Sequence, residues 1–262
     1  MKKATIKCGK TNLHIIADIR DVLLTLITLT IKKWWNRITI SSYCEGIDEQ
    51  ISCLRKLFPD IGSADEKIAK QMFPSGASGW YAIPDWKKIA PTRGEAIKKV
   101  LTLIKKKRNG KFLNYLEGRL NSKHLQQKER SIAMWRGIEE EQKGHDIFIV
   151  AAQLGSVSLR GSSLPDRQYV FDDDEFGFGI YEVGIILLTH HRHLMNSYND
   201  LWIKLIGDEF SCTGDGKFKR TPFFCFISGK LRLGADIFKS MDDNCGQASG
   251  FLQKRLLNSR IY

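Results

Sequence analysis

The sequence pattern that most restricts the fold lies between Pro91 and Gly110. Thr92 and Glu95 have the spacing of a capping box, in which a hydroxyl residue and an acidic residue three positions later satisfy free backbone donors at a helix start. Apolar residues then recur at helical spacing, and Asn109 with Gly110 supplies a stop signal. The apolar positions are Ile97, Val100, Leu101 and Ile104. The pattern predicts an amphipathic helix with its lysines outside.

The same part of the chain carries all of its net charge. Residues 87–136 contain 15 Lys and Arg against 3 Glu, and this leaves 26 basic and 26 acidic side chains for the rest of the 262 residues. The whole chain has a formal charge of +12. A neutral protein with one cationic segment indicates where a polyanion would bind.

Two further apolar patterns follow within this segment. Each is consistent with helical spacing, so three helices in succession are expected to carry the charge. The first pattern consists of Phe112, Leu113, Leu116 and Leu120, and the second of Leu125, Ile132, Trp135 and Ile138.

The remaining elements predict an α+β protein, with a mainly helical N-terminal half and a mixed C-terminal half that carries a small sheet. Residues 13–40 fit a helix or a strand, because a helical face coincides with a β-branched run. The other predicted elements are a helix over 47–58, strands over 146–152 and 201–206, a helix over 182–194, and a hairpin of 223–227 and 230–233.

Turn residues and changes in composition predict the domain organisation. The predicted parts are an N-terminal helical or mixed module (1–73), a turn-rich connector (74–93), the basic helical segment (94–143), a mixed α/β region (144–250) and a helical or disordered tail (251–262, its pattern beginning near Ala248). Residues 94–250 are expected to form one domain.

The basic segment makes nucleic acid the expected partner, because clustered cations neutralise phosphates without reading sequence. Trp80 and Trp86 lie just upstream and could stack on exposed bases. The predicted phosphate contacts are Lys98, Lys99, Lys105, Lys106, Lys107 and Arg108. A solvated helix face and an acidic protein partner are the alternatives, and no motif separates DNA from RNA.

A divalent-metal-dependent hydrolase or nuclease is the enzymatic alternative, and the sequence leaves open whether the chain is an enzyme. His190 and His193 would share one side of a helix, and Asp208 or Glu209 could complete a metal site. The histidines have an ordinary explanation as well, since cations are favoured at a helix C-terminus. No other cofactor is expected.

Other motifs indicate no further chemistry. The acidic run 172–175 fails the EF-hand pattern, and the glycines at 177, 179 and 184 miss the dinucleotide-binding spacing, so they are expected to allow tight turns and close packing. The six cysteines lack zinc or disulfide spacing. The longest apolar stretch, residues 22–31, is too short to cross a membrane, so a cytoplasmic protein without membrane insertion is expected.

Overall fold

The computed structural model describes residues 46–72, 74–154, 173–190, 202–237 and 245–252. Contacts divide the chain into two units, Met1–Cys44 and Glu45–Tyr262, and all described residues belong to the second unit. The helix-or-strand question for residues 13–40 therefore lies outside the described residues. The turn-rich connector 74–93 lies within the second unit.

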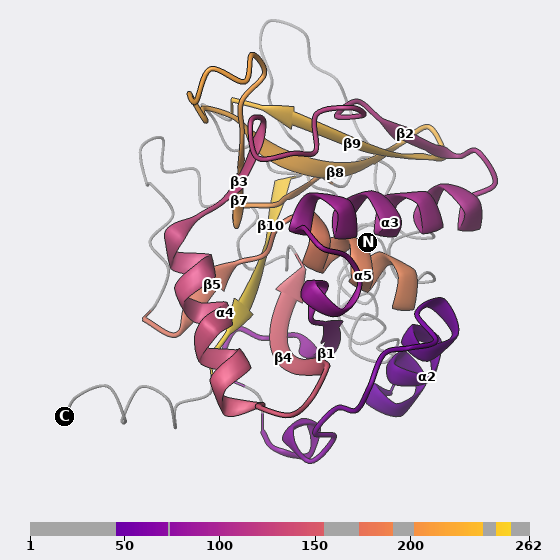
Figure 1. The fold of residues 1–262 in the computed structure, drawn as a ribbon, viewed down its shortest axis with the longest axis vertical. Coiled ribbons are helices and arrows are strands. Elements are labelled where there is room, and N and C mark those ends of the chain that lie inside the picture. The colour runs from indigo at the N-terminus through magenta and orange to yellow at the C-terminus, as the bar shows by residue number, and fades with distance from the viewer. Residues whose placement is uncertain (1–45, 73, 155–172, 191–201, 238–244, 253–262) are drawn as a thin grey trace, which may run out of the picture. The chain divides into compact units, whose positions relative to one another are not determined.

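The described part of the chain is mixed α/β (Figure 1). Its helices are α2 (Ile47–Leu57), α3 (Arg93–Lys107), α4 (Glu129–Glu141) and α5 (Ile180–Thr189), with 3₁₀ turns η1 (Ile68–Lys70) and η2 (Trp86–Lys88). Its strands are β1 (Gly79–Pro84), β2 (Phe112–Asn114), β3 (Leu125–Gln127), β4 (Ile147–Leu154), β5 (Glu175–Gly177), β6 (Trp202–Lys204), β7 (Asp208–Phe210), β8 (Thr221–Ile227), β9 (Lys230–Asp236) and β10 (Cys245–Phe251).

Most of these strands form one large mixed sheet. Among the described residues its order is β1-β4-β10-β6-β8-β9-β2, and β5 also pairs with β10. The β10–β6 and β2–β9 pairs are parallel and the others are antiparallel. Strands β3 and β7 form a separate antiparallel pair. Strand β2 ends the path of the large sheet, so one of its edges has no strand partner among the described residues.

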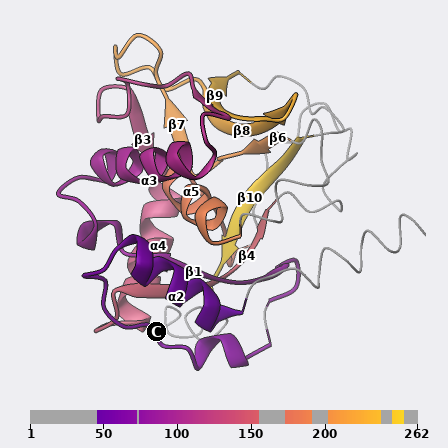
Figure 2. The same ribbon diagram turned by 90° about the vertical axis from the view of Figure 1, so that its right-hand side faces the viewer.

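Helix α5 is the buried centre of the helical layer, and Figure 2 shows it beside α3. Its sequence is apolar all round, which is typical of a helix enclosed by protein. Gly184 allows the close approach of α3, because a Cβ at this position would lie 2.7 Å from Val100 Cγ1. The prediction that this glycine serves close packing is confirmed.

Two buried glutamines pair with backbone groups of β1 and β4 through their side-chain amides. Gln50 of α2 donates from Nε2 to the Trp80 carbonyl (3.1 Å) and accepts from the Ala82 N–H (2.9 Å) at the edge of β1. Gln142, just after α4, does the same for Ile149 of β4, donating at 2.9 Å and accepting at 2.8 Å. Because a buried backbone donor or acceptor is costly without a partner, these side chains stabilise the sheet at positions where no described strand adjoins it.

Several predicted elements are confirmed. Helices α2 and α3, strands β4 and β6, and the β8–β9 hairpin lie where the sequence predicted them. The hairpin turn has positive φ at Ser228 (50°) and Gly229 (74°), which is the backbone that a type I′ turn requires. Helix α5 begins two residues before the predicted start and ends at Thr189, with His190 as its C-cap. Residues 191–194 of the predicted 182–194 helix lie outside the described residues.

Other predictions are wrong. Residues 112–120 do not form a helix; they form β2 and a turn, because β2 pairs with the distant β9. Leu125 belongs to β3, and α4 begins only at Glu129, so two helices and two short strands carry the basic segment. The predicted tail begins inside β10, a strand of the large sheet. A mainly helical N-terminal half is not confirmed, since strands β1, β2 and β3 lie there.

Within the described ranges, no helix is both long and apolar enough to cross a lipid bilayer.

Candidate functional site

The orientation of α3 determines which of its cations reach solvent. Thr92 is the N-cap, and its Oγ1 accepts from the Glu95 N–H (3.3 Å) and donates to the Glu95 carboxylate (3.1 Å). The predicted apolar face of α3 is buried. The remaining helix face therefore presents its lysines outward, as the amphipathic pattern predicted.

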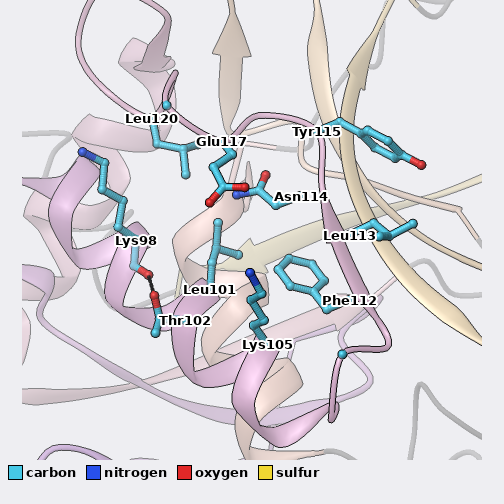
Figure 3. A pocket seen from close by; sticks show the side chains of 12 residues that line it. Lys98, Leu101, Thr102, Lys105, Phe112, Leu113, Asn114, Tyr115, Glu117 and Leu120 are labelled. Atoms are coloured by element: carbon cyan, nitrogen blue, oxygen red, sulfur yellow. Dashed lines mark hydrogen bonds between the residues drawn. The ribbon is translucent and has the colours of Figure 1, made fainter.

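A pocket of about 600 Å³ is lined by residues of α3, of β2 and of the turn that follows β2. Helix α3 contributes Lys98, Thr102 and Lys105, which follow one another along the same helix face. Figure 3 shows Lys105 and Glu117 on opposite sides of the pocket, and the ring of Tyr115 directed away from α3. The apolar lining is Leu101, Phe112, Leu113 and Leu120.

Three of the six predicted phosphate contacts already interact with the protein. Lys99 donates from Nζ to the Ile89 carbonyl, and Lys107 donates to the Leu188 carbonyl at the end of α5, both at 2.6 Å. The guanidinium of Arg108 lies over the Phe226 ring at 5.3 Å, and burial lowers the pKa of Arg108. These three cations are held against the body of the protein.

The other three predicted contacts, Lys98, Lys105 and Lys106, are exposed. Among the described residues, none of their ammonium groups lies within 4.0 Å of a carboxylate. The other basic residues of the segment include several that do pair with acids, such as Lys87 with Glu139 at 2.6 Å. Lys98, Lys105 and Lys106 are therefore the cations of this set that are both exposed and, among the described residues, not held by another part of the protein.

The two tryptophans do not lie with these lysines. Trp80 is in β1, is 9% exposed, and donates from Nε1 to the Gln71 carbonyl at 3.2 Å. A ring held in this way has no free face for a base. Trp86 lies in η2, is half-buried, and lines a second pocket.

The N-terminal end of α3 carries a buried ion cluster that the sequence did not suggest. Arg93 donates to Asp208 Oδ1 at 2.8 Å and to Glu182 Oε2 at 3.1 Å. The carboxylates also receive backbone N–H groups at the start of α5, from Ile180 to Asp208 (2.8 Å) and from Gly179 to Glu182 (2.7 Å). Arg93 and Glu182 are 89 residues apart and Arg93 and Asp208 are 115 apart, so no local pattern could have revealed the cluster.

This cluster holds two carboxylates for one guanidinium. Burial would lower the pKa of Arg93, but the charges of Asp208 and Glu182 outweigh it and raise that pKa above its usual value. Burial raises the pKa of Asp208, Arg93 opposes the change, and Glu182 adds to it. Such a cluster stabilises the fold only while all its members are present.

The structure does not bring the predicted metal ligands together. His190 caps the C-terminal end of α5, where its ring lies 5.1 Å from the Tyr81 ring and its Nδ1 lies 2.9 Å from Thr189 Oγ1. Asp208 binds the N-terminal end of the same helix, about 15 Å away for ten residues of helical rise. One metal ion cannot bridge that distance.

The remaining members of the metal hypothesis add no support. Glu209 follows Asp208 in β7 and instead accepts from Gln126 Nε2 at 3.0 Å, with Lys128 Nζ at 3.9 Å. His193 lies outside the described residues. In the part of the chain that is described, no group of three His, Cys, Asp or Glu side chains could hold a metal ion.

The second pocket, of about 330 Å³, was not predicted. It is formed by side chains of η2, α4, β1, β3, β4 and the start of α5, which come together only in the folded chain. Its lining includes Trp86, Trp135, Tyr181 and Glu182, so it adjoins the buried ion cluster. The only sequence signal was the Asp85–Lys88 turn, where an acid and an aromatic residue follow the apolar strand β1.

Comparisons with protein-family models, with curated proteins and with solved structures found no match for this chain. The function is therefore argued from the geometry of the described residues.

Proposed function

We propose that the protein binds an anionic polymer, DNA or RNA, without sequence preference through the exposed lysines of α3. The observation that carries the proposal is the set Lys98, Lys105 and Lys106, which are exposed and have no acidic partner among the described residues. Lys98 and Lys105 are seven residues apart, or about 10.5 Å along the helix, so their ammonium groups can contact different phosphates of one strand.

The proposed interface is not expected to distinguish one nucleotide sequence from another. Lysine ammonium groups bind phosphates as point charges and release counterions, so affinity depends on salt and not on sequence. Tyr115 is 54% exposed at the rim of the pocket, but its ring points away from the lysines (Figure 3). Base stacking is therefore a minor contribution in this proposal, and phosphate contacts provide the affinity.

The test is the salt dependence of binding, measured by fluorescence anisotropy with labelled single- and double-stranded DNA and RNA. Between about 50 and 200 mM salt, each phosphate contact adds roughly 0.7 to 0.9 to the slope of log K against log salt. Changing Lys98, Lys105 and Lys106 together to alanine should reduce that slope by about 2 to 3 and weaken binding to all probes alike.

A matched control variant distinguishes the effect of where the lysines lie from the effect of the protein's net charge. Lys56, Lys67 and Lys70 are exposed lysines on α2 and around η1, so replacing all three by alanine removes the same charge elsewhere. The control variant should keep the wild-type slope. Equal losses in the two variants would show that only net charge matters, and unchanged binding in the first variant would contradict the proposal.

The same titration addresses the two alternatives. If the chain failed to bind any nucleic acid at low salt, the nucleic-acid proposal would be wrong, and an acidic protein partner or a solvated helix face would remain as the role of this surface. Running the titration with EDTA and with magnesium, followed by a gel, detects metal-dependent cleavage. We do not propose the metal-dependent hydrolase, since α5 separates His190 from Asp208.

A further inference from the structure

The second pocket has aromatic walls from separate elements. Trp86 comes from η2, Trp135 from α4 and Phe148 from β4, and the rings of Trp135 and Phe148 lie 6.4 Å apart. The packing of Trp135 against Phe178 (5.9 Å, stacked) holds this wall in place. A volume of about 330 Å³ is at the small end of ligand sites, enough for one flat ring with a short substituent.

Acidic groups outnumber basic groups in the lining. The acids are Asp85, Glu139 and Glu182, and the bases are Lys87 and Arg136. Lys87 is bound to Glu139, and Glu182 is bound to Arg93 behind the pocket. Asp85 has no ion pair within 4.0 Å among the described residues, so its carboxylate is the acid that remains for a ligand.

Burial raises the pKa values of two acidic groups that line the pocket. Burial raises the pKa of Asp85, and the charge of Glu139 adds to this, while Lys87 and Lys88 oppose it. Burial raises the pKa of Tyr181 well above its usual value, and the charges of Glu182 and Asp85 add to it. A cation near these groups would relieve part of this cost.

One cation of the protein, the Lys87 ammonium, already lies between an aromatic ring and a carboxylate of this pocket. The Lys87 ammonium lies 5.9 Å from the centroid of the Trp86 ring and 2.6 Å from Glu139 Oε1. This arrangement combines a cation–π contact with an ion pair. The side chains of Lys87 and Glu139 are 48% and 31% exposed, and pairs at the surface contribute little, so Lys87 can move aside at small cost.

We propose that this pocket binds a small organic cation, with its flat apolar body against the indoles of Trp86 and Trp135 and its charged group toward Asp85. A neutral aromatic ligand would bury the Asp85 carboxylate without a partner, and an anion would be repelled by that carboxylate. The pocket is separate from the lysines of α3, so this site does not depend on the proposed nucleic-acid binding.

The first test compares two ligands of the same shape on the unmodified full chain. Benzamidine is a cation at neutral pH and benzamide is its neutral counterpart, so titration calorimetry with each isolates the charge. Benzamidine should bind at least about tenfold more tightly than benzamide, because only the cation forms a charge-assisted hydrogen bond. Equal affinities, or no measurable binding of benzamidine, would overturn the proposal.

The second test removes the carboxylate and keeps the local structure. Asp85 accepts from the Lys87 N–H at 3.0 Å as the cap of η2, and asparagine serves equally well in that role. Asp85→Asn should therefore fold normally and weaken benzamidine binding by about tenfold.

Asp65→Asn is the matched control, since Asp65 accepts from the Lys67 N–H at 3.2 Å in the same kind of turn, before η1. This variant should bind benzamidine as the wild type does. Wild-type affinity in Asp85→Asn, or an equal loss in Asp65→Asn, would show that the Asp85 carboxylate does not hold the cation.

Discussion

Positive charge is paired with acidic side chains at the first residue of α3 but is exposed to solvent on the outer face of the same helix. Arg93 is buried between Glu182 and Asp208, whereas Lys98 and Lys105 extend into solvent beside an open pocket. Both kinds of residue belong to the one cationic segment of the sequence. The comparison shows that a local excess of charge does not identify a binding surface, since distant acids can compensate part of it.

The largest expected effect comes from removing the buried cation. Arg93→Met would leave two carboxylates buried without their guanidinium, and breaking a buried ion pair in this way costs roughly 3–5 kcal/mol. Chemical denaturation measures the loss. Lys98→Met is the control on the exposed face and should leave the unfolding midpoint unchanged. A similar midpoint for Arg93→Met and wild type would mean that the cluster does not stabilise the fold.

The pH dependence of stability sharpens the comparison. Because burial raises the pKa of Asp208, the folded state binds that proton more tightly than the unfolded state, whose pKa is near 3.8. The free energy of unfolding of the wild type should therefore rise relative to Asp208→Asn as the pH falls from above the folded-state pKa to below 3.8. Urea denaturation of both proteins across this range measures the difference. A constant difference would contradict the raised pKa.

The smallest expected effect distinguishes two neighbouring lysines. Lys98 is free at the pocket, whereas Lys99 donates to the Ile89 carbonyl at 2.6 Å. Lys98→Ala should reduce the salt slope of nucleic-acid binding by about 1, and Lys99→Ala should change it by less. Anisotropy titrations of the two variants measure this. Equal slopes would mean that the contact with Ile89 does not withdraw Lys99 from the interface.

Local sequence patterns predicted the elements whose stabilising interactions lie close together in the sequence. The capping residues of α3, its buried face and the Ser228-Gly229 turn all depend on neighbours within a few residues. The same reasoning failed for β2 and β10. Each is a short segment with weak periodicity, and its strand conformation depends on a partner far along the chain, such as β9 for β2.

The candidate site was predictable only in part for the same reason. The sequence singled out six cations on α3, and three of them proved to be held by Ile89, Leu188 or Phe226. The second pocket had no sequence signal beyond the Asp85–Lys88 turn, because its walls come from six elements.

The sequence by itself determined the amphipathic helix α3, the β8–β9 hairpin and the position of the chain's excess charge, because spacing and composition are local properties. Only the tertiary structure decided which cations stay uncompensated, where the two pockets lie, and that His190 and Asp208 sit at opposite ends of α5. Those outcomes depend on burial and on partners up to 115 residues away, and the free energies of burial and pairing are set by the folded arrangement.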